Sequence, residues 1–121
     1  MVQTWKVSWN KDFYNYKGII EDFKDNKLDV IKQSKGLAHM VNIPNIGDKV
    51  YVSCNTLKII SCEVISNFEI NNDVHESDIY NIGFERRHTG NDTHLKMQIL
   101  EVFDNPVRLI GNQRTWCKYI V

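Results

Sequence analysis

The chain has 121 residues, with fifteen basic and fifteen acidic side chains and a formal net charge of zero. This length suits one domain with a core of its own, so we expect a single domain over residues 1–121. The charge balance argues against a protein that coats long stretches of duplex, because such binding needs clustered Lys and Arg, but it leaves open a site for one nucleotide or a short segment.

The sequence also predicts the compartment. No stretch approaches the roughly 20 apolar residues of a membrane span, and the opening residues MVQTWKVSW lack a signal-peptide pattern. The three cysteines, an odd number without close pairing, suit a reducing environment. We expect a monomeric cytoplasmic or nuclear protein with no membrane contact.

The first predicted strand contains Trp5, Val7 and Trp9 on one face. Asn15 to Lys24 is predicted as a helix, because apolar residues recur there at spacings of three and four. Leu28 and Ile31 suggest a second short helix that closes at residues 34–36.

The middle of the chain predicts a hairpin. Asn45–Asp48 has the composition of a turn, with a Gly available for positive φ, and Lys49–Ser53 follows as a strand. Residues 54–56 are predicted to form a tight loop. The returning strand starts at Leu57, with the even positions from Ile60 facing the core, so that Ile59 and Ile65 on the other face need partial cover.

The second half is rich in strands. Residues 71–78 are predicted as a polar loop and Ile79 to Arg87 as a strand. Leu95, Met97 and Ile99 alternate with polar residues, and the phase changes at Leu100, which indicates a β-bulge. Asp104 to Pro106 and residues 111–112 are predicted as turns. The last residues form a strand, which we expect to pair with the first strand.

About six strands with one or two short helices follow from these patterns. Sequential hairpins favour a curled, mostly antiparallel sheet, whose closure would remove exposed edges. We therefore predict an α+β fold built on a small β-barrel.

This arrangement resembles the PUA-like superfamily, and within it the EVE and YTH-related branch, with ASCH domains as the close alternative. The resemblance rests on an early strand with Trp5, on Lys35-Gly36-Leu37 after the helical region, on residues 46–53 (IGDKVYVS), on the strand through residues 60–67, and on residues 111–116 (GNQRTW). It implies binding of RNA, or of a modified base flipped out of RNA or DNA, without a cofactor.

Such a base must be stacked between aromatic faces and read on its edge by a few polar groups. In related domains the segment with Lys35, Gly36 and His39 lines the pocket, and the resemblance places Tyr51 and Ser53 near its mouth. The residues predicted to contact the ligand are Ser8, Trp9, Asn10, Lys35, Gly36, Leu37, His39, Tyr51, Ser53, Asn55, Arg87, Arg114 and Trp116.

Several of these residues also have purely structural interpretations. Trp9 forms either a stacking wall, with Ser8 and Asn10 reading a base edge, or ordinary packing with a locally bonded indole N–H. If Trp9 or Trp116 is a stacking wall, its replacement by Ala should abolish binding and leave the fold intact. Arg114 lies two residues from Trp116, on the same strand face, where Arg could pin a phosphate while Trp stacks.

The polar and basic loops carry the same ambiguity. Asn55 lies in a hairpin loop, which is usually only a loop but can carry function on a rigid scaffold. Residues 86–88 (RRH) form a basic cluster that, with Lys96 and Arg114, either contacts phosphates or is simply solvated.

Catalytic and metal sites have little support. A zinc site would combine Cys54 and Cys62 with His88 and His94, but no Cys-x-x-Cys or His-x-x-x-His spacing is present, so we expect no metal and ordinary thiols at all three cysteines, Cys117 included. Two alternative functions stay open. The first is an ASCH-type amidohydrolase acting on a modified nucleoside, with Lys35, Thr56 and Glu63. The second is a protein-interaction adaptor that exposes Ile59 and Ile65.

Overall fold

The computed structural model of the protein describes residues 2–9, 12, 14–34, 43–54, 57–70, 75–80, 93–108 and 116–119, and the structural statements below concern these residues. The elements in chain order are β1 (Thr4–Trp9), α1 (Tyr16–Lys24), β2 (Val30–Ser34), β3 (Lys49–Cys54), β4 (Leu57–Val64), β5 (Glu69–Ile70), the 3-10 helix η1 (Glu76–Tyr80), β6 (Thr93–Arg108) and β7 (Trp116–Lys118).

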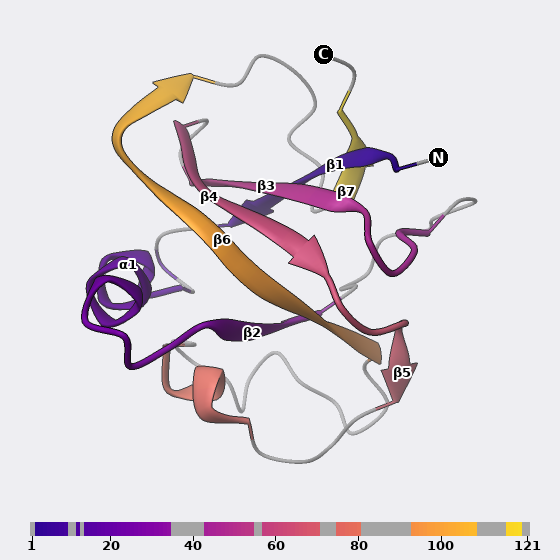
Figure 1. Cartoon of the computed structure of the whole chain (residues 1–121), viewed down its shortest axis with the longest axis horizontal. Coiled ribbons are helices and arrows are strands. Elements are labelled where there is room, and N and C mark those ends of the chain that lie inside the picture. Colours follow the sequence, from indigo (N-terminus) through magenta and orange to yellow (C-terminus); the bar gives the residue numbers. More distant parts are fainter. Residues whose placement is uncertain are drawn as a thin grey trace.

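All of these strands belong to one mixed sheet in the order β2-β6-β4-β3-β1-β7, with β5 paired to β6 off this path. β1 runs parallel to β3, and the other described pairings are antiparallel. β6 crosses the molecule diagonally, and the twisted sheet curls into a half-barrel with α1 at its side (Figure 1). The prediction of a small, barrel-like α+β fold is confirmed at this level.

The first and last described strands lie next to each other at one edge of the sheet. β1 pairs with β7 in antiparallel register, with Val7 opposite Trp116, and Figure 1 places the two strands side by side. The prediction that the first strand pairs with a late one is therefore confirmed.

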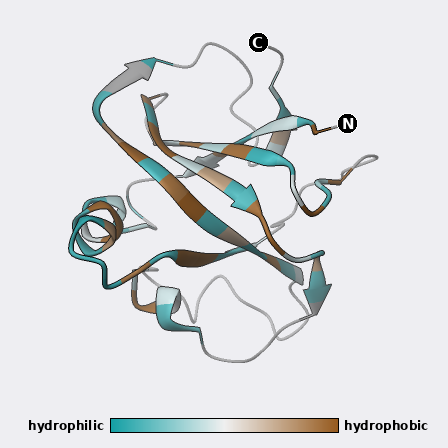
Figure 2. Cartoon of the chain, viewed as in Figure 1, coloured by the Kyte–Doolittle hydropathy of each residue, from teal (hydrophilic) through white to brown (hydrophobic). Residues whose placement is uncertain are grey.

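The inner face of the sheet carries the hydrophobic core. Trp5, Val7 and Trp9 are buried and share one face of β1, as predicted. The strand register adds the buried residues Val50, Val52, Ile60, Cys62, Val64, Met97 and Ile99. Figure 2 shows hydrophobic, brown bands along β3, β4 and β6. The predicted alternation of β3 and β4 is confirmed.

A β-bulge interrupts β6 at Leu100. Ser61 pairs with Glu101 and Cys62 pairs with Ile99, so Leu100 is left out of the ladder and is 51% exposed. An extra residue on one strand reverses the alternation of side chains beyond it. The bulge predicted from the phase change is therefore confirmed.

The helix α1 begins and ends at local sequence signals. The Asn15 side chain is the N-cap and accepts a hydrogen bond from the Gly18 N–H at 3.1 Å. Ile19 is buried, and Phe23 packs against the core from the same stripe. The chain leaves the helix through Asn26, whose φ is +59°, a conformation that Asn tolerates better than most residues. The predicted helix is confirmed.

The second predicted helix is wrong. Val30–Ser34 forms strand β2, which pairs antiparallel with β6. The spacing of Leu28 and Ile31 fits a helix, but β-branched Val30 and Ile31 suit a pleated surface, and pairing with β6 decides between the two. Local periodicity is ambiguous for such a short apolar run.

The predicted strand from Ile79 to Arg87 is wrong at its start. Glu76–Tyr80 forms the 3-10 helix η1, so regular structure also begins inside the predicted loop of residues 71–78. Residues 81–87 lie outside the described residues. Tyr80 is buried and Ile79 is 78% exposed, a difference that one turn of helix accommodates as readily as a strand.

The predicted turn at Asp104–Pro106 is also wrong, because β6 continues through it to Arg108. The pairing of β6 with β4 is irregular between Lys58 and Ile60, where extra residues of β6 are accommodated. Ile59, predicted to lie on the outer face, is only 3% exposed at this irregularity. It is therefore part of the core.

The turn before β3 is tied to β1 by one buried carboxylate. Gly47 has a φ of +96°, which favours Gly, and confirms the predicted turn. Asp48 accepts hydrogen bonds from the Gln3 N–H (3.0 Å), the Trp5 indole Nε1 (3.0 Å) and the Asn45 N–H (2.9 Å). Burial alone would raise the pKa of Asp48, but these three hydrogen bonds together with the positive charge of the N-terminus outweigh it and hold the pKa below its ordinary value.

Tyr80 connects η1 to α1. Its hydroxyl donates a hydrogen bond to the Asp22 carboxylate, and its carbonyl accepts one from the Asn15 N–H at 2.8 Å. Burial, followed by the Asp22 hydrogen bond and the charges of Asp22 and Glu76, raises the pKa of Tyr80 from 10.0 to about 12. The phenol therefore keeps its proton to a higher pH in the folded state than in the unfolded state.

Tyr80→Phe is expected to lower the free energy of unfolding by about 1 kcal/mol at neutral pH, because one hydrogen bond to a carboxylate is lost. Between pH 10.0 and about 12 the folded protein holds a proton that the unfolded chain releases, so wild-type stability falls as the pH rises through this window. Urea denaturation at neutral pH and across this window measures both effects, with Tyr16→Phe as the matched control. An equally steep alkaline decline in Tyr80→Phe would contradict the assignment.

Candidate functional site: the outer face of the sheet around Tyr51

The structure places five of the predicted ligand-contacting residues on two opposite faces of the sheet. Trp9 and Trp116 face inward, whereas Ser8, Tyr51 and Ser53 alternate with inward residues and face outward. These five side chains therefore do not surround one concave pocket. The other predicted residues lie outside the described part of the chain: Asn10, Lys35, Gly36, Leu37, His39, Asn55, Arg87 and Arg114.

Trp9 is part of the core. It is 5% exposed, and its ring stacks on Tyr14 at a centroid distance of 4.8 Å and an interplanar angle of 10°. Its indole Nε1 donates to the Gln33 Oε1 at 2.7 Å. These contacts match the packing interpretation, in which the indole N–H finds a local partner.

Trp116 has the same kind of environment. It is 3% exposed, and its Nε1 donates to the Ser34 carbonyl at 3.0 Å. The Phe68 ring meets it edge-on at 5.7 Å. Since Trp9 and Trp116 come from β1 and β7 and both bond to the end of β2, the two indoles hold the opposite edges of the half-barrel together.

Ser8 and Ser53 lie on the outer face of the sheet, where their hydroxyl groups hydrogen-bond to each other. The two residues are direct neighbours across β1 and β3. The Ser53 hydroxyl donates to the Ser8 hydroxyl at 3.4 Å, and Ser53 is only 2% exposed. A base edge would have little access to Ser53 here.

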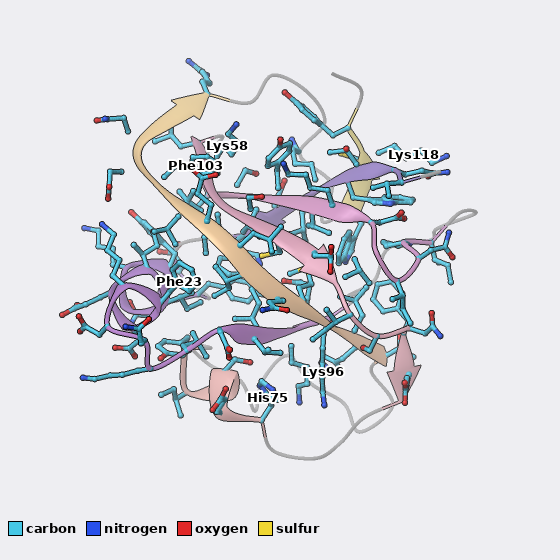
Figure 3. The ribbon with its side chains drawn as sticks, in the orientation of Figure 1. Phe23, Lys58, His75, Lys96, Phe103 and Lys118 are labelled. Carbon is cyan, nitrogen blue, oxygen red and sulfur yellow. The ribbon has the colours of Figure 1, made fainter. Side chains whose placement is uncertain are left out.

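Tyr51 lies at the centre of a half-buried aromatic and basic surface. The Lys58 ammonium lies 4.6 Å from the ring centroid of Tyr51 and 4.6 Å from that of Phe103, and Figure 3 shows Lys58 and Phe103 next to each other. Lys49 lies 5.1 Å from the Tyr51 centroid, and the Tyr119 ring meets Tyr51 edge-on at 5.7 Å. We call these five residues the Tyr51 face.

Charges around the Tyr51 face are close to balanced. Glu63 of β4 is directly opposite Lys49 of β3. Tyr51 is opposite Ser61 of β4, and Ser61 is in turn opposite Glu101 of β6. On the other side of Tyr51, Lys6 is in register with it and is 3% exposed. A ligand would therefore gain more from the aromatic rings than from long-range attraction.

No group of three or more His, Cys, Asp or Glu residues that could hold a metal ion occurs in the described ranges, which exclude His88. Cys54 and Cys62 are buried free thiols, and Cys117 is half-buried. Burial raises the pKa of the Cys62 thiol, which keeps it protonated. A protonated, buried thiol is a poor metal ligand and a poor nucleophile.

The described residues include only part of the sets on which the two alternative functions depend. Of the amidohydrolase set, Lys35 and Thr56 are not described, and Glu63 is an exposed residue one position before the end of β4. For the adaptor hypothesis, Ile59 is buried and only Ile65, 36% exposed, faces solvent.

Sequence patterns alone did not identify four members of the Tyr51 face: Lys49, Lys58, Phe103 and Tyr119. The sequence did predict that Tyr51 faces outward in its strand. The predicted hairpin between β3 and β4 could also have indicated that Lys58 lies near Tyr51, because Lys58 pairs with Ser53. Phe103 lies in a part of β6 whose pairing with β4 is shifted between Lys58 and Ile60. That irregularity depends on long-range register.

No family model matches the sequence, and no curated protein matches it. The resemblance to PUA-like domains therefore stays a prediction. Among the described helices, none is long and apolar enough to cross a membrane.

Proposed function

We propose that the protein binds short single-stranded nucleic acid on the Tyr51 face. One observation carries the proposal: a single ammonium group, that of Lys58, lies 4.6 Å from each of two ring centroids on a half-buried sheet surface. Aromatic rings interleaved with lysines are the arrangement on which unpaired bases stack while ammonium groups contact the backbone.

Binding would exchange one set of contacts for another. A lysine over an exposed aromatic ring contributes about 0.5–1 kcal/mol, whereas a base stacked on an aromatic side chain contributes about 1–3 kcal/mol. A base that takes the place of Lys58 over Tyr51 would therefore gain free energy, and the displaced ammonium would be free to contact a phosphate. The exchange favours the bound state.

An open surface suits bases of a single strand better than one base held in an enclosed pocket. The rings of Trp9 and Trp116 are buried against the protein's own residues. The stacking role is thus assigned to Tyr51, Phe103 and Tyr119, and binding of a modified base is not part of the proposal. Few lysines contribute, so we expect a weak dependence on salt.

The experiment is fluorescence anisotropy with labelled single-stranded RNA and DNA of the same sequence, and with the duplex, at low salt. We expect saturable binding of the single strands. Tyr51→Ala should weaken it by roughly 5- to 150-fold, which corresponds to the loss of one stacked base, while Tyr51→Phe should bind almost normally. Lys58→Gln should reduce the slope of the logarithm of the binding constant against the logarithm of the salt concentration by the amount expected for about one phosphate contact.

Lys27→Gln is the matched control, because Lys27 is an exposed lysine beyond the end of α1. Circular dichroism checks that each variant is folded. If neither single strand binds at low salt, or if folded Tyr51→Ala binds as tightly as wild type, the proposal is wrong. A difference between the RNA and DNA arms would identify the natural ligand class.

A further inference from the structure

A recess of about 80 Å³ opens on the outer face of the sheet, where β2 and β5 flank the start of β6. Its volume is several times the roughly 10–15 Å³ that a cavity needs to hold one water molecule. The recess is lined by Lys32, Ser66, Glu69, His94, Leu95 and Lys96.

The recess concentrates positive charge. Lys32 on β2 is directly opposite Lys96 on β6, and directly opposed residues of an antiparallel pair have Cβ atoms only about 4.5–5.5 Å apart. Like charges at this distance destabilise a sheet. Lys32 is also only 9% exposed, and a buried ammonium needs compensating negative charge or hydrogen-bond acceptors.

One carboxylate faces the two lysines. Glu69 is opposite His94, which lies on the same face of β6 as Lys96 and is 6% exposed. Among the side chains that line the recess, two ammonium groups and one carboxylate sum to a charge of +1, with His94 counted as neutral. An ammonium has three N–H donors, so Lys32 can hold a partner within the protein and still donate to an anion.

The wall of the recess is fixed by hydrogen bonds. The Ser66 hydroxyl accepts from the Lys96 backbone N–H at 2.8 Å and donates to the Asn67 carbonyl at 3.3 Å. On the other side, the Lys32 backbone N–H donates to the Ser77 hydroxyl of η1 at 3.0 Å. Both lysines thus project from anchored backbone, which lowers the entropy cost of holding a ligand between them.

We propose that this recess binds a small phosphate-class anion, held by the ammonium groups of Lys32 and Lys96 with His94 as an additional hydrogen-bond partner. The site is separate from the Tyr51 face, because Lys96 and Phe103 are seven residues apart on β6, roughly 20 Å along a strand. Figure 3 shows Lys96 and Phe103 toward opposite ends of β6. The two proposals can therefore fail independently.

The test is a titration of the ¹⁵N-labelled protein with inorganic phosphate and with pyrophosphate, monitored by NMR at constant ionic strength and pH, with sodium chloride as the reference. We expect saturable shifts at Lys32, Ser66, His94 and Lys96. Lys96→Gln should weaken phosphate binding at least roughly tenfold, as expected for loss of a charge-assisted hydrogen bond. Lys118→Gln is the matched control, since Lys118 is an exposed lysine of β7.

Shifts that do not saturate, shifts that chloride reproduces, or unchanged phosphate affinity in folded Lys96→Gln would overturn the proposal. His94→Gln provides a second variant in which both lysines are retained, and we expect it also to weaken binding. A further arm tests the source of the phosphate. If Lys96→Gln weakens oligonucleotide binding as well, the recess takes a backbone phosphate, and if it does not, the recess takes a free phosphate or a small phosphorylated molecule.

Discussion

Trp9→Ala is expected to lower the free energy of unfolding by about 3–5 kcal/mol, the usual cost of removing a large aromatic side chain from a core. Trp9 is 5% exposed and stacks on Tyr14, so its removal leaves a cavity. It also leaves the Gln33 Oε1, now bonded at 2.7 Å, without its donor. Because Trp9 links β1 to the end of β2, we expect the half-barrel to open at this edge first.

Denaturant unfolding of Trp9→Ala, with Ile79→Ala as the control, measures this effect. Ile79 is 78% exposed, so its truncation should change stability by less than about 0.5 kcal/mol. Trp9→Phe keeps one aromatic ring against Tyr14 but loses the hydrogen bond and part of the indole volume, so we expect a loss of stability smaller than that of Trp9→Ala. A Trp9→Ala variant with wild-type stability and no oligonucleotide binding would instead restore the stacking-wall interpretation.

Asp48→Ala is expected to lower the free energy of unfolding by about 3 kcal/mol at neutral pH. It leaves the Gln3 and Asn45 N–H groups and the Trp5 indole without their shared acceptor, and each buried unsatisfied donor costs about 1–3 kcal/mol when no water replaces the acceptor. Asp48→Asn keeps the shape but offers a single acceptor oxygen, and we expect an intermediate loss.

The Asp48 carboxylate should also make the stability of the protein depend on pH in the acid range. The pKa of Asp48 in the folded protein lies below its ordinary value of 3.8, so the unfolded chain binds a proton more readily than the folded protein does. The contribution of Asp48 is therefore complete above this ordinary value and is lost as the pH falls through the folded pKa. Thermal unfolding between pH 5 and pH 2 should show a shallower decline in Asp48→Asn than in wild type.

Asp25→Asn is the matched control for this experiment, because Asp25 is exposed at the end of α1. It should follow the wild-type pH dependence closely. Identical acid profiles for wild type and Asp48→Asn would show that the three hydrogen bonds to Asp48 do not contribute to stability.

Much of the fold could be predicted because burial imposes short-range patterns. The alternation of Trp5, Val7 and Trp9 identified the inner face of β1, and the phase change at Leu100 identified the bulge in β6. In both cases the alternation shows which side chains face the core, and at the bulge these are Ile99 before it and Val102 after it, whereas Leu100 itself is exposed. The error at β2 has the opposite cause, because Leu28 and Ile31 fit a helix and only pairing with β6 selects the strand.

The candidate site was harder to predict because it depends on contacts between distant strands. Trp9 and Trp116 are large aromatic residues near strand ends, and neither burial nor exposure follows from that position. Lys58 and Phe103 meet beside the second irregularity in the pairing of β6 with β4, between Lys58 and Ile60, and unlike the bulge at Leu100 this one was not predicted from the local sequence. The outward position of Tyr51 was predictable, but its neighbours on the outer face were not.

Photochemical cross-linking tests the central claim of nucleic-acid binding on the Tyr51 face most directly. A short single strand with a photoreactive base is irradiated with the protein at low salt, and mass spectrometry of the digested protein identifies the linked residues. We predict cross-links at Tyr51, Phe103 or Tyr119 that disappear when excess unlabelled strand is added. Specific cross-links confined to other parts of the chain, or none at all, would contradict this account.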